Sequence, residues 1–427
     1  MIPDVVVVGG GPAGLTAAIA AAGAGAGVVV CERLPRPGRK LLASGGGRCN
    51  LTNTLSPGEF VERLGRHGRF ALPALEALGP EALRSFLSER GVATRSEDGF
   101  RVFPSSGRSG DVLTALLREC GRRGVIVRRR AAVKALLIEN GRVVGVDTTG
   151  GPLRARSVVV AAGGLGYPDL GGSGDGYSMA RAAGHDVREP VPALVGLTVS
   201  ESWARRCAGV SVSGVAVAVR GPGRRDSAEG DLLFTHRGVS GQAVLDVSGT
   251  AGELLAAGRP VSLAVSLVAG MGRAEWLGEM ERWRARDGRR TVAALLAERL
   301  PRSLAHALCE RAGAGGVRAG SLPRGARDGL AGILSGLELT VVGTGGFAGA
   351  MVTRGGVALR GVDPRTMTSR LVSGLLFAGE VLDVDGPSGG FNLQWAFSSG
   401  WLAGASAAAS AAARDPERPG ARREGTQ

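Results

Sequence analysis

The sequence predicts an α/β chain in which a doubly wound domain with a parallel sheet is interrupted by an inserted domain. Three observations lead to this prediction: a valine run with a glycine-rich turn and helix opens the chain, alternating apolar segments and helical runs fill its middle, and a strand–glycine–helix block closes it. We expect the interrupted domain at residues 1–188 and 340–413, the insertion at 189–339, and a disordered polar tail at 414–427.

The first strand and its turn predict a dinucleotide site. Residues 4–14 read DVVVVGGGPAG, and a four-valine run is typical of a strand buried on both faces. Gly9 allows a tight turn, Gly11 lets a pyrophosphate approach the backbone, and Gly14 lets the next helix pack closely. The N-terminus of that helix presents free N–H groups to phosphate. The residues of this turn expected at the cofactor are Gly9, Gly11, Pro12, Ala13 and Gly14.

The next strand, residues 28–31, ends at an acidic residue that favours an unphosphorylated ribose. Glu32 follows Gly14 at the spacing where a carboxylate binds ribose hydroxyls and disfavours a 2′-phosphate. We expect Glu32 and the adjoining Arg33 to contact the adenosine half of the cofactor.

A second glycine-rich segment, residues 35–53, favours FAD over a nicotinamide dinucleotide as the bound cofactor. Its glycines indicate backbone packed closely against a ligand, its basic side chains suit a pyrophosphate, and its amides and hydroxyl suit a ring system. The alternative is a long surface loop with solvated arginines. Cys49 could be a redox thiol, although the lack of a nearby partner cysteine favours a packed loop residue. The expected contacts are Arg39, Lys40, Leu41, Gly46, Gly47, Arg48, Cys49, Asn50 and Thr52.

Later strands supply the remaining expected contacts. We expect strands at residues 141–147 and 156–162, with Val133 near the adenine and with Ala162 and Gly163 at a strand end. Residues 375–380 form another strand and turn. A helix from about residue 392 would place its N-terminus at the N1/O2 edge of the flavin and stabilise negative charge there; the alternative is a glycine turn before a packing helix. The expected contacts here are Gly379, Glu380, Gly390, Phe391, Asn392 and Leu393.

The insertion predicts a small β-barrel or sheet with a helical lobe. Residues 210–219 alternate at period two, and residues 274–283, 291–300 and 303–313 form helical runs. We expect this domain to cover the flavin face and to carry substrate specificity. His236 is the candidate proton donor, since histidine titrates near neutral pH; the alternative is a structural turn residue.

The composition narrows the partners. The 427-residue chain carries 52 basic and 38 acidic residues, and its arginines are dispersed, which makes nucleic-acid binding unlikely for want of a clustered patch. Its five cysteines show no metal-ligand spacing, so we expect reduced thiols and no metal. No apolar run has the length of a membrane span, and the first strand begins too early for a signal peptide. A cytoplasmic protein is expected, with its oligomeric state open.

Four blocks of the sequence resemble a known family. They read GRKLLASGGGRCNLTN, AAGGLGYPDLGGSGDGYSMARAAGH, LLFTHRGVSG and GLLFAGEVLDVDGPSGGFNLQWAFSSGWLAG, and they are similar to the BaiN/RdsA-type (YhiN-like) FAD-dependent oxidoreductases. The resemblance implies a Rossmann-like FAD-binding domain interrupted by an insertion. It also implies activities such as reduction of conjugated double bonds or oxidation of small amino ketones. Phe391 stands where the family more often has Tyr, which puts a tyrosine proton donor there in doubt.

These observations predict an FAD-dependent oxidoreductase with non-covalent FAD. The expected reaction reduces an activated C=C bond of a small organic substrate, with NAD(P)H as a transient electron donor because no second nucleotide-binding turn is visible. One alternative is an amine or C–H oxidase or dehydrogenase that passes electrons to oxygen. Another is an RNA-associated flavoprotein, suggested only by the charge.

Overall fold

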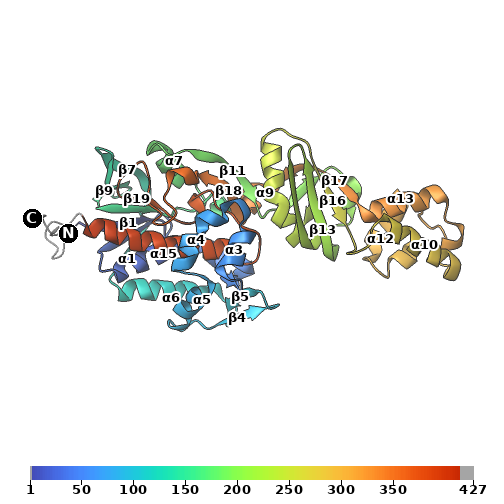
Figure 1. The fold of residues 1–427 in the computed structure, drawn as a ribbon, viewed down its shortest axis with the longest axis horizontal. Coiled ribbons are helices and arrows are strands. Elements are labelled where there is room, and N and C mark those ends of the chain that lie inside the picture. Colours follow the sequence, from blue (N-terminus) through green and yellow to red (C-terminus); the bar gives the residue numbers. More distant parts are fainter. Residues whose placement is uncertain (1, 414–427) are drawn as a thin grey trace, which may run out of the picture. The chain divides into compact units, whose positions relative to one another are not determined.

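The computed structural model describes residues 2–413 and divides the chain into two compact units. Unit 1 comprises the chain up to Pro190 and again from Val352, and unit 2 comprises Val191–Met351 (Figure 1). The predicted α/β architecture with an interrupting insertion is confirmed. The tail predicted at 414–427 lies outside the described residues.

A five-stranded parallel sheet forms the centre of unit 1. Its strand order is β19-β10-β1-β2-β6. All four valines of β1 are buried, as is every residue of β2 and β10, because helices and loops cover both faces of the sheet. The strands are β1 (Val5–Val8), β2 (Val28–Glu32), β6 (Ile126–Arg129), β10 (Ser157–Val160) and β19 (Leu375–Phe377).

Two helices from opposite ends of the chain lie side by side on this sheet. Helix α1 (Pro12–Gly23) and the long helix α15 (Phe391–Ala412) run together in Figure 1. Glycines make the approach possible, because a Cβ at Gly400 would lie 2.2 Å from the Ala13 carbonyl oxygen and one at Gly404 would lie 2.0 Å from that of Ala17. The helix predicted from about residue 392 is therefore confirmed, and it is fixed against the first helix of the chain.

Shorter elements complete unit 1. The predicted strands at 141–147 and 156–162 are confirmed as β8 and β10. The helices are α2 (Arg39–Ala43), α3 (Pro57–Arg63), α4 (Gly68–Ala77), α5 (Pro80–Ser88), α6 (Ser109–Arg122) and α7 (Asp175–Ala182). The strands are β3 (Thr52–Asn53), β4 (Thr94–Glu97), β5 (Arg101–Pro104), β7 (Val133–Glu139), β8 (Arg142–Thr148), β9 (Gly151–Arg154) and β18 (Val352–Val357). Strand β11 (Val187–Ala193) begins in unit 1 and ends in unit 2.

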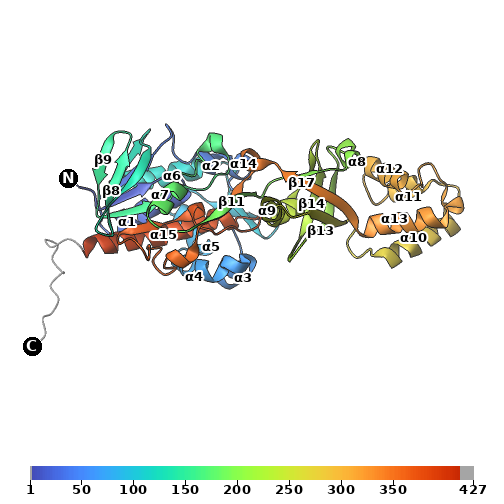
Figure 2. The same ribbon diagram turned by 90° about the horizontal axis from the view of Figure 1, so that it is seen from above.

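Unit 2 is a closed six-stranded barrel with a helical lobe at one end (Figure 2). The strand order around the barrel is β12-β15-β14-β13-β16-β17. The strands are β12 (Leu197–Val199), β13 (Ser211–Gly221), β14 (Arg224–Phe234), β15 (Gly238–Ser240), β16 (Val261–Ser266) and β17 (Leu337–Thr344). The helices are α8 (Ser202–Arg206), α9 (Gln242–Ala256), α10 (Arg273–Arg286), α11 (Val292–Leu296), α12 (Arg302–Arg311), α13 (Arg324–Ser335) and α14 (Gly346–Gly349).

Strand β17 lies across the position at which the sequence placed the end of the insertion. It pairs with β16 on one side and with β12 on the other, closing the barrel, so the residues on both sides of position 340 belong to unit 2. The compact unit continues to Met351.

Each unit has its own hydrophobic core. The cluster around the valine strands contains residues of unit 1, and a second cluster inside the barrel and helical lobe contains residues of unit 2. Within residues 2–413, no helix combines the length and the apolar character needed to cross a bilayer.

Candidate functional site

The sequence-predicted cofactor residues gather at the carboxyl ends of the parallel strands. In the strand order β19-β10-β1-β2-β6, the chain leaves β1 toward β2 on one side while β10 lies on the other. This is a topological switch point, where ligands bind in open α/β sheets. Gly9, at the end of β1, lies against the Ala161 and Ala162 backbone at the end of β10.

The glycines of the first turn differ in what surrounds them. A Cβ at Gly9 would lie 2.5 Å from the Ala161 carbonyl oxygen, and one at Gly14 would lie 1.9 Å from the Gly9 carbonyl oxygen. At Gly11 a Cβ would meet no atom within 4 Å, although this residue caps helix α1. Gly46 and Gly163 face similar open space. The space beside the backbone is thus open at Gly11, Gly46 and Gly163, whereas the protein's own packing requires glycine at Gly9 and Gly14.

Glu32 is buried and holds the turn in place. One carboxylate oxygen accepts from the Gly10 N–H at 2.8 Å and the other from the Leu34 N–H at 2.7 Å. A carboxylate oxygen accepts more than one hydrogen bond, so both remain able to accept from ribose hydroxyls. The following backbone keeps the predicted adenine segment close, since the Ala131 N–H donates to the Glu32 carbonyl oxygen at 2.9 Å, just before Val133 begins β7.

Two helix N-termini of unit 1 offer backbone N–H groups that suit anionic or electron-rich ligand atoms. Helix α1 begins after Gly11 and α15 begins after Gly390, and neither has a side-chain cap. The first N–H groups of a helix have no partner within it, and they carry a partial positive charge. A Cβ at Gly390 would lie 2.3 Å from the Thr52 carbonyl oxygen, so the α15 N-terminus adjoins the second glycine-rich segment.

An ion-pair network not foreseen from the sequence joins that segment to the C-terminal block. Lys40 Nζ lies 2.6 Å from Glu380 Oε2, and Glu380 Oε1 accepts from the Thr353 N–H at 2.8 Å. The Thr353 hydroxyl in turn accepts from the Leu165 N–H at 2.8 Å. Sequence reasoning named Lys40 and Glu380 but missed Thr353, because it belongs to no motif and enters unit 1 only after the insertion.

The second glycine-rich segment is also fixed by polar contacts. Asn50, with its amide oriented to satisfy its neighbours, accepts from the Gly390 N–H at 3.1 Å and donates to the Thr52 carbonyl oxygen at 3.0 Å. Cys49 is fully buried, and burial raises the pKa of its thiol to about 12. A thiol in this state is unreactive, which favours the packed-residue interpretation.

The Arg48 side chain is held by two other residues of unit 1. Its guanidinium pairs with Glu97 at 2.9 Å and lies over the Phe103 ring, 4.2 Å from its centroid. Both groups belong to the β4–β5 hairpin. Neutralisation of a pyrophosphate by this side chain would require it to leave both partners.

In the C-terminal block, the side chains of Phe391 and Asn392 contact other parts of the protein, so the backbone is what remains for a ligand. The Phe391 ring is buried 4.6 Å from the Phe60 ring centroid, and the Asn392 amide is bonded to Gly386 in both directions, at 2.9 and 2.8 Å. Gly379 is held by the Ser399 hydroxyl and Trp395 Nε1. Any contact of Phe391 or Asn392 with a cofactor would therefore use the N–H groups of the first helical turn.

The remaining predicted residues fall into three groups. Pro12, Ala13, Leu41, Gly47, Thr52, Val133, Ala162 and Leu393 are buried or half-buried, while Arg33 and Arg39 are exposed. Arg33 pairs with Asp175 at 3.1 Å. His236 belongs to unit 2 and is exposed in the turn between β14 and β15, so its catalytic role stays a prediction.

The site fits an elongated dinucleotide with a ring system. Open glycine backbone, a carboxylate at the ribose position and two uncapped helix N-termini offer complementary groups at successive points of such a ligand. A nicotinamide dinucleotide would leave the second glycine-rich segment and the α15 N-terminus without a partner.

Comparison with known proteins gives consistent matches. The family model "HI0933-like protein Rossmann domain" matches residues 3–406. A 3-dehydro-bile acid delta(4,6)-reductase of Clostridium scindens is 33% identical over 421 residues, covering 94% of this chain and 98% of that protein. A ribosomal RNA dihydrouridine synthase of Escherichia coli is 31% identical over 404 residues, covering 93% and 96%. The Haemophilus influenzae enzyme of the same name is 31% identical over 405 residues, again covering 93% and 96%.

Solved structures share the fold at low identity. The FrdA chain of E. coli quinol fumarate reductase superposes with a TM-score of 0.54 at 20% identity, covering 99% of this chain and 72% of that chain. The 3-ketosteroid delta1-dehydrogenase of Sterolibacterium denitrificans gives 0.54 at 16% identity, covering 96% and 100%.

Proposed function

Because this chain belongs to the HI0933-like Rossmann-domain family and is an FAD-dependent oxidoreductase, we propose that it reduces an activated carbon–carbon double bond with electrons from NAD(P)H. One observation supports this reaction most: relatives of two different names, matched over more than nine-tenths of the chain, are named for saturating a ring double bond. Dihydrouridine differs from uridine by two hydrogens on one ring C=C bond, and a delta(4,6)-reductase removes unsaturation from a steroid ring system.

The proposed FAD contacts follow from the geometry of unit 1. Glu32 binds the ribose, the α1 N-terminus and Gly11 receive the pyrophosphate, and Val133 contacts the adenine. Lys40, Glu380 and the loop around Gly46 enclose the remainder. The full proposed set is Gly9, Gly11, Pro12, Ala13, Gly14, Glu32, Arg33, Arg39, Lys40, Leu41, Gly46, Gly47, Arg48, Cys49, Asn50, Thr52, Val133, Ala162, Gly163, Gly379, Glu380, Gly390, Phe391, Asn392 and Leu393.

The chain's own residues position the cofactor and stabilise charge. FAD, when bound, supplies the hydride chemistry. The N–H groups at the start of α15 offer fixed donors to a ring edge that gains negative charge, at no cost of reorganisation. The net reaction adds a hydride and a proton across the double bond, NAD(P)H is oxidised to NAD(P)⁺, and water supplies the proton directly or through His236.

The substrate class divides into two candidates. A small unsaturated organic molecule is the first, by similarity to the Clostridium scindens reductase. Uridine within RNA is the second, because two relatives are named ribosomal RNA dihydrouridine synthases and this chain carries a net charge of +14. The same double-bond reduction serves both.

The visible spectrum of the purified protein tests the proposal. Recorded anaerobically, a flavin spectrum should bleach on addition of NADPH or NADH, and it should recover on addition of an α,β-unsaturated ketone or of a uridine-containing RNA. Recovery with one acceptor and not the other decides between the two substrate classes.

Other outcomes would contradict the proposal. A flavin that ignores both nicotinamides but is reduced by an amine, with peroxide formed in air, would establish an oxidase instead. An unchanged turnover after His236→Ala would remove that residue from the mechanism.

A further inference from the structure

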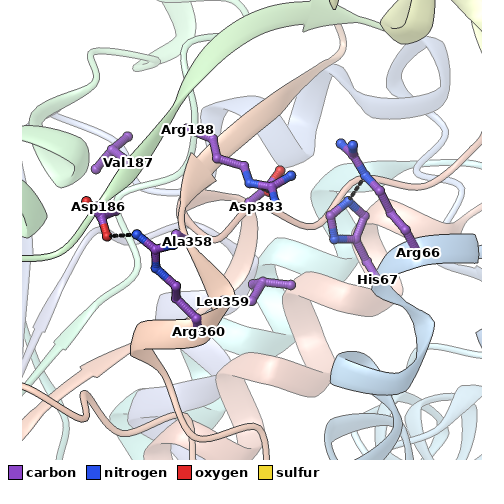
Figure 3. A pocket seen from close by; sticks show the side chains of 9 residues that line it. All are labelled: Arg66, His67, Asp186, Val187, Arg188, Ala358, Leu359, Arg360 and Asp383. Atoms are coloured by element: carbon purple, nitrogen blue, oxygen red, sulfur yellow. Dashed lines mark hydrogen bonds and ion pairs between the residues drawn. The ribbon is translucent and has the colours of Figure 1, made fainter. Parts of the chain in front are cut away.

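One cavity of unit 1 is lined by charged groups that the proposed FAD site does not use. It has a volume of about 360 Å³, and none of its lining residues belongs to the proposed cofactor set. Figure 3 shows its polar side chains as three neighbouring pairs, and each pair contains one arginine. They are Arg66 with His67, Arg188 with Asp383, and Arg360 with Asp186.

The charge of this cavity is positive. Three arginines and two aspartates line it. Arg354 also acts on His67, but its pairing with Asp385 at 2.9 Å adds no net charge. His67 is buried, and burial together with Arg66, Arg354 and Arg188 lowers the pKa of its imidazole to about 3. The imidazole is therefore neutral and accepts from Arg66 Nε at 2.6 Å, which leaves the positive charge with the arginines.

Two of the arginines keep donors available for a ligand. Arg188 Nε lies 3.1 Å from Asp383 Oδ2, and this nearly fully buried carboxylate holds the guanidinium in position while its side chain stays 59% exposed. Arg360 is 79% exposed and pairs with Asp186, itself 67% exposed. An exposed pair of this kind contributes little stability and exchanges readily for a stronger anion.

The cavity also has an apolar wall. Val187, Ala358 and Leu359 line it between the charged groups. Arg188 and Arg360 belong to different segments, β11 and the turn after β18, and their guanidinium groups lie on two sides of the cavity. Such an arrangement suits the tetrahedral oxygens of a phosphate better than the planar pair of a carboxylate. The volume exceeds that of the anion alone and leaves room for part of its carrier.

We propose that this cavity binds the phosphate group of a small organic phosphate, with Arg188 and Arg360 donating to its oxygens and the apolar wall packing against its carbon skeleton. The proposal goes beyond the proposed reaction and does not depend on it. A cavity of this size favours a small ligand, whereas a nucleic acid requires an extended basic groove.

Calorimetric titration of the FAD-loaded protein with ribose 5-phosphate, and with ribose as the matched ligand without phosphate, tests the site. We expect ribose 5-phosphate to bind and ribose not to bind. Arg360→Gln should weaken binding about tenfold or more, because a charged hydrogen-bond donor is lost. Arg188→Gln should act alike, but it removes the ion pair between Arg188 and the buried Asp383. Arg360→Gln, at an exposed position, keeps the test independent of folding.

The matched control is Arg154→Gln. Arg154 is 54% exposed and pairs with Glu139 on the β7–β9 sheet, away from the cavity lining, so this variant removes the same charge from the same unit. Equal weakening by Arg154→Gln would indicate a general charge effect and overturn the site. So would unchanged binding in Arg360→Gln, or binding of RNA oligonucleotides without binding of ribose 5-phosphate.

Nicotinamide kinetics identify the source of the phosphate. If the cavity receives the 2′-phosphate of NADPH, Arg360→Gln should raise the KM for NADPH and leave that for NADH unchanged. If the cavity receives a phosphorylated substrate, Arg360→Gln should change the KM for NADPH and the KM for NADH equally. Both results support the site, and the titration alone decides whether it exists.

Discussion

At Gly14 an added Cβ would lie 1.9 Å from the Gly9 carbonyl oxygen, whereas at Gly11 it would meet nothing within 4 Å. The two glycines belong to one motif and look alike in the sequence. Their surroundings predict different consequences of the same substitution, one on folding and the other on ligand binding.

Gly11→Ala should therefore leave the melting temperature of the FAD-free protein almost unchanged while weakening FAD binding about tenfold or more, since the methyl group occupies space needed by the pyrophosphate. Gly14→Ala should destabilise the FAD-free protein by about 3 kcal/mol through overpacking. Thermal unfolding and FAD titration of both variants check this. Full FAD affinity in Gly11→Ala would show that the pyrophosphate lies elsewhere.

Glu119 is a buried carboxylate surrounded by arginines. Arg122 and Arg90 lie 2.7 and 3.2 Å from its Oε1, and Arg123 also donates to it. These partners, Arg122 foremost, lower the pKa of the carboxyl to about 2. Because the folded pKa is below the unfolded value, the group stabilises the protein above about pH 4 and loses this effect as the pH falls toward 2.

Glu119→Gln should accordingly lower the free energy of unfolding at pH 6 by about 2 kcal/mol. The difference in stability between this variant and the natural protein should become smaller as the pH falls from 5 to 2. Thermal unfolding across that range measures the difference. Glu139→Gln, which removes an exposed pair with Arg154, should show almost no deficit at any pH. A deficit of Glu119→Gln that stays constant with pH would contradict the assignment.

How far single residues could be predicted depends on whether their role is local. Glu32 follows from spacing, because its strand, turn and helix are consecutive in the chain. The pairing of Arg48 with Glu97 and the role of Thr353 could not be predicted, since each depends on a partner brought close only by the fold. The phosphate role of Arg48, predicted from its charge, stays a prediction.

Among the elements, α1 and α15 are in close contact. Gly404 lies over the Ala17 carbonyl oxygen, where a Cβ would be 2.0 Å away. Gly121, in α6 of the same unit, has no atom within 4 Å of an added Cβ. The two positions are matched, since each is a glycine inside a helix of unit 1.

Gly404→Ala should cost about 2 to 3 kcal/mol by forcing the two helices apart, and it should also weaken FAD binding because both helices begin at the cofactor site. Gly121→Ala should be neutral or stabilise by up to about 1 kcal/mol through helix propensity. Chemical unfolding of both variants provides the measurement. Equal effects at the two positions would refute the close contact.

Secondary structure was predictable where a pattern was continuous. The valine runs of β1 and β10 and the alanine-rich helices follow from burial on both faces and from helix propensity. The end of the insertion was not predictable, because β17 completes a barrel with β12 and β16, and this pairing is non-local.

For the whole molecule, the two separate cores predict two unfolding transitions. FAD should raise the unfolding temperature of unit 1 alone. At a concentration of one hundred times its Kd, it should add about 2.7 kcal/mol to the free energy of unfolding of that unit. Leu263→Ala, in the core of unit 2, should lower the other transition by about 2 to 5 kcal/mol without changing FAD affinity. Differential scanning calorimetry resolves both. A single transition that FAD and Leu263→Ala both shift would show that the units unfold together.

The division of unit 1 across the sequence also affects biosynthesis. Strands β1, β2, β6 and β10 leave the ribosome before unit 2, whereas β19 and α15 leave after it. While the barrel is synthesised, the nascent valine strands therefore lack their edge strand β19, and one helix-covered face of the sheet lacks α15. The cofactor can be bound fully only once the last helix has emerged, so chain completion and flavin loading become one late event. A ribosome-stalled chain ending before residue 375 should fold its barrel and yet remain colourless.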